Sequence, residues 1–144
     1  MKLLDTNVPI SATSRGDPLQ DWAQTAIKRA VAHGGAAINA VTLAELCACA
    51  GGNSSLLKTL ETWGVEFLDV PTNAAPICGA AYAKYLANRK ASSATPAPRV
   101  PLPDFFIGAH AEVMGWELIT NDDRKFKTYF PALKSEQPPR QAAT

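Results

Sequence analysis

Four acidic residues in separate parts of the chain lie where a predicted strand or loop meets a predicted helix. They are Asp5, Glu45, Asp104 and Asp122. Hard divalent cations such as Mg²⁺ and Mn²⁺ prefer oxygen ligands, which carboxylates from several segments can supply together. A bound ion of this kind activates water and offsets the charge that builds on a phosphate during cleavage. The four acids therefore indicate metal-assisted hydrolysis of a phosphodiester.

Each acid also has a purely structural alternative. Asp5 can form a turn with Asn7 after a strand, and this role is favoured if Asp5 is considered alone. Glu45 fits the capping-box spacing that begins at Thr42, and capping is again favoured for the single residue. The remaining acids can complement the positive end of a helix: Asp104, Asp122 and the adjoining Asp123. The metal hypothesis therefore depends on the acids as a set.

Strands and helices that could position these acids alternate along the chain. Apolar runs predict strands at residues 2–4, 36–40, 65–70 and 116–120. Helical spacing predicts helices at residues 17–33, 42–50, 53–63, 72–90, 105–114 and 122–130. This alternation predicts an α/β sandwich around a mainly parallel sheet, with sites beyond the carboxyl ends of the strands. Asp5 and Asp122 lie at such strand ends.

Length and composition predict one domain. A chain of 144 residues with 47% hydrophobic content can bury one substantial core. Residues 91–103 contain four prolines and are expected to form a loop. The polar residues 134–144, which include Pro138 and Pro139, are expected to be a disordered tail after a domain that spans residues 1–133.

No segment predicts export or membrane insertion. The longest apolar-rich stretch, residues 36–50, is interrupted by Asn39, Thr42 and Glu45, so we expect a soluble, cytoplasmic protein. Three cysteines are an odd number, and the two that are close in sequence point to nearly opposite faces of a predicted helix. Neither a disulfide framework nor a zinc site is therefore expected.

The net charge of +1 conceals an uneven distribution. Once the acids at the four positions and Asp123 are set aside, eight acidic residues remain against 14 Lys and Arg. If those acids converge on a metal, the rest of the surface is basic enough to attract a polyanion. Arg124, Lys125 and Lys127 are the best candidates for phosphate contacts, followed by Arg15, Arg89, Lys90 and Arg99. For this second group a solvated basic face remains an equal alternative.

The residues around the acids resemble the PIN domain family, specifically the VapC-type toxin ribonucleases of bacterial toxin-antitoxin pairs. The resemblance covers residues 1 to about 133 and follows the family's motif order. It is carried by residues 3–7, 41–46, 104–111, 118–122 and 126–133. It implies a three-layer α/β/α sandwich with a mainly parallel central sheet.

The same resemblance implies roles for individual residues. Asp5, Asp104 and Asp122 would hold Mg²⁺ or Mn²⁺, and Glu45 would be a further ligand or would orient a water. Asp123 is an alternative to Asp122 because the two adjoin. Residues that would orient the ligands or touch the phosphate are Thr6, Asn7 and Thr120. His110 is expected to have a packing role, and the three tryptophans are expected to lie in the core or at an interface rather than to stack on bases.

The resemblance also implies a substrate and partners. We expect an endoribonuclease that leaves 5′-phosphate and 3′-hydroxyl ends, a VapB-like antitoxin bound across the site, and a homodimer. The residues themselves do not distinguish RNA from DNA, so a structure-specific DNA nuclease remains an alternative. A PIN-like binding module without turnover is another, although binding alone has no need for clustered acids. A phosphatase is disfavoured because Asn7 stands where such enzymes use a second Asp.

Overall fold

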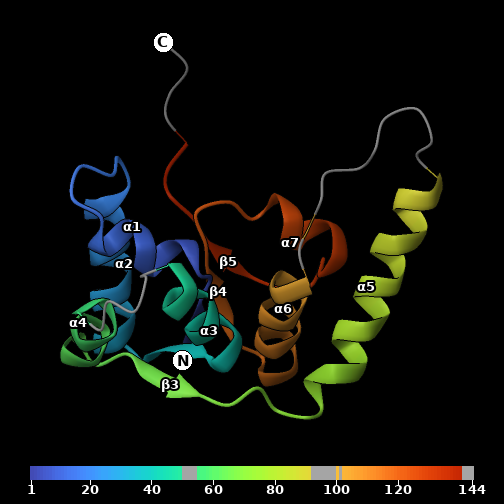
Figure 1. The fold of residues 1–144 in the computed structure, drawn as a ribbon, viewed down its shortest axis with the longest axis horizontal. Helices are drawn as coiled ribbons and strands as arrows, with labels where there is room; N and C mark the ends of the chain where they lie inside the picture. Colours follow the sequence, from blue (N-terminus) through green and yellow to red (C-terminus); the bar gives the residue numbers. More distant parts are fainter. Residues whose placement is uncertain (50–54, 92–99, 101, 141–144) are drawn as a thin grey trace.

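The computed structural model describes residues 1–49, 55–91, 100 and 102–140. Its strands form one parallel sheet in the order β3-β2-β1-β4-β5 (Figure 1). They are β1 (Lys2–Leu4), β2 (Ala36–Asn39), β3 (Glu66–Leu68), β4 (Glu117–Ile119) and β5 (Ser135–Glu136). The predicted α/β class with a parallel central sheet is confirmed.

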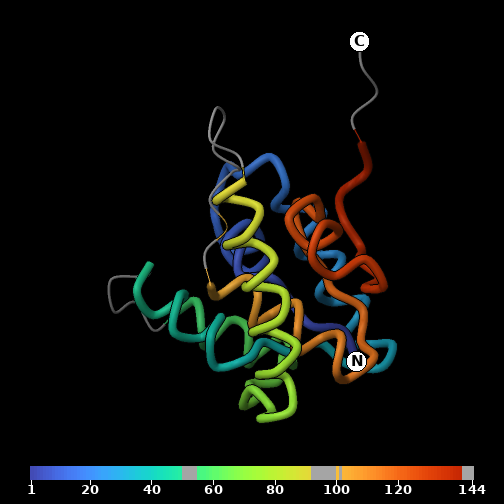
Figure 2. The backbone as a smooth tube through the Cα atoms, turned by 90° about the vertical axis from the view of Figure 1, so that its right-hand side faces the viewer, coloured from blue at the N-terminus to red at the C-terminus, as the bar shows by residue number. Residues whose placement is uncertain are grey.

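Helices cover both faces of this sheet. They are α1 (Asn7–Thr13), α2 (Gln20–Ala32), α3 (Ala40–Cys49), α4 (Ser55–Trp63), α5 (Ala74–Ala91), α6 (Leu102–Met114) and α7 (Arg124–Tyr129). Figure 1 shows α1, α2 and α4 on one side of the sheet and α5, α6 and α7 on the other. Figure 2, seen from the α5 side, shows α5 running along α6, with which it is in contact.

Alternating side chains on the central strands form two separate cores. Leu3 lies in register with Ala37 and Leu118, and all three contact the helices on the α6 side. The next residues, Leu4 and Ile119, are fully buried against the helices on the opposite side. Successive residues of a strand point to opposite faces, so each strand contributes to both layers. The result is the predicted α/β/α sandwich.

Several predicted boundaries differ from the observed ones. A short helix, α1, begins at Asn7, two residues after Asp5, and was not predicted. The helix predicted from residue 17 begins at Gln20, because the Asp17 side chain accepts a hydrogen bond from the Leu19 amide and closes a preceding turn. Helix α6 begins at Leu102 instead of residue 105, since Pro103 is tolerated in a first helical turn. Residue 50 of one predicted helix and residues 53–54 of the next lie outside the described residues. So do residues 92–99 and 101 of the predicted proline-rich loop.

The expected disorder from residue 134 onward is wrong for the first residues of that segment. Ser135 and Glu136 form β5, which pairs with Leu118 and Ile119 of β4. The Glu136 carboxylate accepts a hydrogen bond of 2.8 Å from the Lys2 ammonium. Backbone pairing and charged contacts need no apolar side chains, so the polar composition did not reveal this strand. The boundary predicted at residue 133 therefore divides the sheet.

Candidate functional residues gather at the carboxyl end of the sheet. Asp5 follows β1, Thr120 follows β4, and α3 begins immediately after β2. None of the helices in the described part of the chain is long and apolar enough to cross a membrane.

Candidate active site

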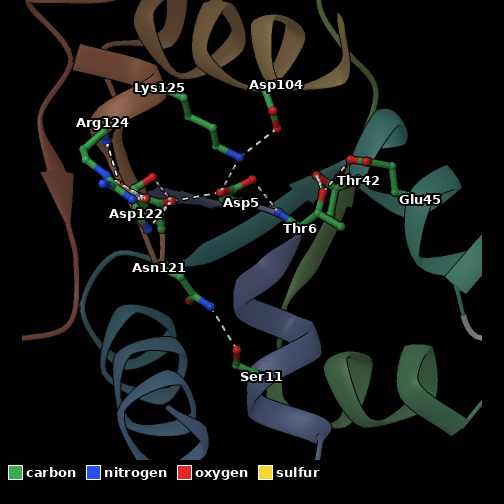
Figure 3. A network of polar contacts seen from close by, with 11 residues as sticks. Asp5, Thr6, Ser11, Thr42, Glu45, Asp104, Asn121, Asp122, Arg124 and Lys125 are labelled. Carbon is green, nitrogen blue, oxygen red and sulfur yellow. Dashed lines mark hydrogen bonds and ion pairs between the residues drawn. The ribbon is translucent and has the colours of Figure 1, made fainter. Parts of the chain in front are cut away.

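Asp5 is held firmly at the end of β1. Its side chain is buried, and both carboxylate oxygens accept hydrogen bonds. The Thr6 amide donates to Oδ1 at 2.8 Å (Figure 3). The Thr120 hydroxyl donates to Oδ2 at the same distance of 2.8 Å. Asn7 makes no turn contact of the kind proposed as an alternative, but it does line the same pocket as Asp5. The carboxylate is therefore oriented by the predicted residues Thr6 and Thr120.

Asp104 lies in the first turn of α6 and faces Asp5 across a lysine. The Lys125 Nζ atom is 3.1 Å from Asp104 Oδ1 and 3.5 Å from Asp5 Oδ2. Burial raises the pKa of Asp104, an effect that the nearby Lys125 reduces without reversing. Burial lowers the pKa of Lys125, but the charges of Asp5 and Asp104 outweigh it and raise that pKa overall. The carboxylates of Asp5 and Asp104 thus converge on the Lys125 ammonium.

Glu45 faces this region from α3 and does not form a capping box. The Thr6 hydroxyl donates to Glu45 Oε1 at 2.7 Å and also lies 3.3 Å from the Thr42 hydroxyl. The helix is capped instead by Asn39, whose Oδ1 accepts hydrogen bonds from the amides of Val41 and Thr42. The structural alternative for Glu45 is therefore absent, and its carboxylate lines the pocket.

Asp122 also lines the pocket, with a half-exposed side chain. Both of its carboxylate oxygens accept hydrogen bonds of 2.9 Å from the Arg124 guanidinium, which lowers the pKa of Asp122. Its Oδ1 also accepts a hydrogen bond of 3.0 Å from the Arg124 amide, so it contributes to the start of α7 as well. Figure 3 shows Asp122 beside Asp5 but paired with Arg124.

Asp123 makes its contacts away from the pocket. It is buried, and its Oδ2 accepts hydrogen bonds from Ser135, Gln137 and Lys127 at 3.1, 3.2 and 2.9 Å. Burial raises the pKa of Asp123, but the hydrogen bonds from Lys127 and Ser135 outweigh it and lower the pKa overall. Asp123 therefore connects the start of α7 to the segment that contains β5.

One pocket of about 840 Å³ contains the acids predicted at all four positions. Its lining includes Asp5, Glu45, Asp104, Asp122, Arg124 and Lys125. Sequence reasoning missed a second part of the wall, which Asn88, Val100 and Tyr129 contribute. Asn88 reaches the site from α5, which lies along α6, and Tyr129 reaches it from the end of α7. No local pattern signals this packing. Arg15, Arg89 and Lys90 are not in this lining, and Arg99 lies outside the described residues.

The donor set suits a hard divalent cation, although the side chains are not arranged around one. Among residues 1–49, 55–91, 100 and 102–140, no three His, Cys, Asp or Glu side chains are grouped closely enough to hold an ion. Asp5 and Asp104 already share one cationic neighbour, whereas Glu45 and Asp122 are engaged by Thr6 and Arg124. An ion could thus bind between the first pair, and the second pair would have to reorient to reach it.

His110 has the expected packing role. Its side chain is buried, its ring lies 5.5 Å from that of Trp116, and its Nδ1 is 3.2 Å from the Asn39 amide nitrogen. An amide nitrogen donates, so Nδ1 accepts and the ring is neutral in this arrangement. Trp22 and Trp63, which are partly buried, pack against the other core.

Protonation of His110 is expected to destabilise the fold at acid pH. Burial lowers the pKa of His110 below its ordinary value of 6.5. The stability that the neutral ring contributes is therefore present above that value and is lost as pH falls below it. Between about pH 7 and pH 5, wild type should lose more thermal stability than His110→Gln, which keeps an acceptor for Asn39. Parallel decreases in the two melting curves would exclude this role.

Comparison with known proteins identifies the class that this fold and pocket define. Residues 2–130 match the PIN domain family, so the chain belongs to that family. No curated protein sequence matches it.

Solved structures share the same architecture. The VapBC2 structure from Rickettsia felis, bound to a DNA fragment from its promoter, is similar at a TM-score of 0.74 and 22% identity, covering 94% of this chain and 97% of that one. A toxin-antitoxin complex from Klebsiella pneumoniae has a TM-score of 0.63 and 21% sequence identity, and the match covers 92% of this chain and 95% of that one. FitAcB from Neisseria gonorrhoeae has a TM-score of 0.60 and 23% sequence identity, and the match covers 94% of this chain and 96% of that one. At these identities, the similarity shows a common fold.

Proposed function

We propose that this PIN domain protein is a divalent-metal-dependent endoribonuclease and the toxin of a toxin-antitoxin pair. The observation that carries the proposal is the convergence of the Asp5 and Asp104 carboxylates on the Lys125 ammonium. The pocket that contains them is also lined by Glu45 and Asp122. Clustered carboxylates in an accessible pocket are what a metal-dependent phosphodiesterase requires. Membership of the PIN family supports the same chemistry.

In this proposal Mg²⁺ or Mn²⁺ is held by Asp5, Asp104 and Asp122. The ion, when bound, supplies an activated water and neutralises charge on the phosphate. Thr6 and Thr120 keep the Asp5 carboxylate in a fixed orientation through the hydrogen bonds described above. Glu45 contributes a further ligand or orients the attacking water by accepting its hydrogen bond.

The basic residues at the pocket would hold the substrate. Arg124 is almost fully exposed and can exchange Asp122 for a phosphate, to which its guanidinium can donate two hydrogen bonds. Lys125 is the second candidate for a phosphate contact. Lys127, by contrast, is paired with Asp123 outside the pocket, so we no longer assign it this role.

We propose RNA as the substrate, a VapB-like antitoxin as the partner, and a homodimer in the cytoplasm as the working form. Two of the similar structures are described as VapBC2 bound to promoter DNA and as a toxin-antitoxin complex, which supports an antitoxin partner. Cleavage of RNA and DNA of one sequence, compared in the same buffer with Mn²⁺, tests the substrate. Faster cleavage of DNA would favour the structure-specific DNA nuclease, and binding without cleavage of either would favour the non-catalytic module.

Replacing each of the two adjacent aspartates should show which one acts in the site and which one stabilises the fold. Asp122→Ala should lose most cleavage activity with little change in melting temperature, because Asp122 lines the pocket and is half-exposed. Asp123→Ala should instead lose thermal stability, because it leaves Ser135, Gln137 and Lys127 without their shared buried acceptor. Cleavage rates and melting temperatures of both variants test this assignment. If Asp123→Ala were the less active enzyme at a temperature where both are folded, the assignment of the fourth acid would be wrong.

A further inference from the structure

Lys125 is the only lysine in the described part of the chain that bridges two of the candidate metal ligands. It lies on α7, and its side chain is only a quarter exposed. Its ammonium is 3.1 Å from Asp104 and 3.5 Å from Asp5, and it also lies 5.1 Å from the centre of the Phe126 ring. Figure 3 shows the lysine reaching down between the two carboxylates. Its charged group thus occupies the space that the two acids share.

The two acids need a cation in this position even when no metal is bound. Asp5 and Asp104 are both buried, and like charges at close range in a partly dehydrated site disfavour each other. Thr6 and Thr120 donate hydrogen bonds to Asp5, but no comparable hydroxyl contact to Asp104 is seen in the described residues. The Lys125 ammonium provides the compensating charge for both.

A divalent ion bound by both acids would have to take the same position. Oxygen ligands lie roughly 2.0–2.6 Å from hard divalent ions such as Mg²⁺ and Ca²⁺. An ion bound by both carboxylates therefore leaves no room for an ammonium between them. The lysine side chain is long and flexible, and the open pocket beside it gives the ammonium space to move away. Lysine and metal therefore exclude each other.

We propose that Lys125 is an internal cation that stabilises the metal-free site and must leave it when a metal binds, so that this lysine lowers the metal affinity. The proposal rests on the function proposed above, because it assumes that Asp5 and Asp104 hold a divalent ion. It gives Lys125 a role separate from the phosphate contact that its basic charge alone suggested. The displaced ammonium remains beside the acids, where it keeps the pocket attractive to an anion.

Titration of Mn²⁺ into metal-stripped full-length protein by calorimetry tests this role. Lys125→Gln should bind Mn²⁺ about tenfold more tightly than wild type, a difference of about 1.4 kcal/mol. Lys127→Gln is the matched control, because it removes the same charge from the same helix but its ammonium contacts Asp123 outside the pocket. Its Mn²⁺ affinity should remain that of wild type. In EDTA, Lys125→Gln should melt below wild type, and it should gain more stability from Mn²⁺.

The possible outcomes separate this inference from the proposed function. If wild type binds Mn²⁺ and Lys125→Gln binds it equally or more weakly, lysine does not compete with metal, and the nuclease proposal is untouched. If neither protein binds Mn²⁺, the inference fails together with the proposed metal dependence. If Lys125→Gln is unfolded in EDTA, Mn²⁺ should restore its fold at concentrations that stabilise wild type. Failure to restore it would contradict the inference.

Discussion

An Asp5→Asn variant is expected to lose nearly all cleavage activity and most of the stabilisation that Mn²⁺ gives to wild type. A metal that binds only the folded state stabilises it by about 2.7 kcal/mol at a hundredfold excess over Kd. Asp5 supplies one of the two carboxylates that converge on the Lys125 ammonium, so in the proposed mechanism its neutralisation removes a metal ligand. Thermal melts of both proteins with and without Mn²⁺ measure the difference.

The same variant should fold in EDTA with a melting temperature close to that of wild type. An Asn side chain at this position can still accept from the Thr6 amide, and its own amide can donate to the Thr120 hydroxyl, which also lies within 3.0 Å of the Asp122 carbonyl oxygen. Loss of the contact with Lys125 is offset by relief of repulsion from Asp104. Asp21→Asn, on the exposed face of α2, is the charge-matched control. If Asp5→Asn unfolds in EDTA, Asp5 is primarily a structural residue.

Truncation after Leu133 is expected to destabilise the fold strongly. It removes β5, which pairs with β4, and it removes Ser135 and Gln137, which donate hydrogen bonds to the buried Asp123. A hydrogen bond to a charged group contributes about 1.5–3 kcal/mol, so the loss of two is a large fraction of the roughly 5–15 kcal/mol that stabilises a typical domain. Chemical denaturation of the truncated and full-length proteins measures the loss.

A second truncation provides the control for this effect. Removal of residues 141–144 leaves every described contact of β5 in place, so that shortened protein should unfold like the full-length chain. Equal stability of the chain that ends at Leu133 would show that β5 contributes nothing to the fold. The boundary at residue 133 would then be correct after all.

Most of the strands and helices and the acidic set were predictable because they depend on local patterns, whereas α1 and β5 were missed. Short apolar runs such as residues 2–4 become strands, and polar residues that follow parallel strands meet at one edge of the sheet. Asp5 and Asp122 could be placed near one another on that basis alone. The family resemblance added Glu45 and Asp104, which reach the same pocket from α3 and α6.

Other features depend on contacts between distant residues and carry no local signal. Asp122 and Asp123 adjoin in sequence, yet the first lines the pocket and the second binds Ser135. Gly108 is required where the Phe130 ring lies against α6, because an added Cβ would be 2.5 Å from that ring. The phosphate contact of Lys125 stays a prediction, and the position of its ammonium between Asp5 and Asp104 was not anticipated. Each of these arrangements is decided by tertiary packing.

Cleavage by metal-stripped protein is the decisive test of metal dependence. Full-length protein treated with EDTA and dialysed should not cut RNA, and added Mn²⁺ or Mg²⁺ should restore cleavage, because in the proposed mechanism the bound ion activates the attacking water. Asp5→Asn, assayed in parallel, should remain inactive at the same metal concentrations. Undiminished cleavage of RNA by the metal-stripped wild type would show that no divalent ion takes part in the reaction.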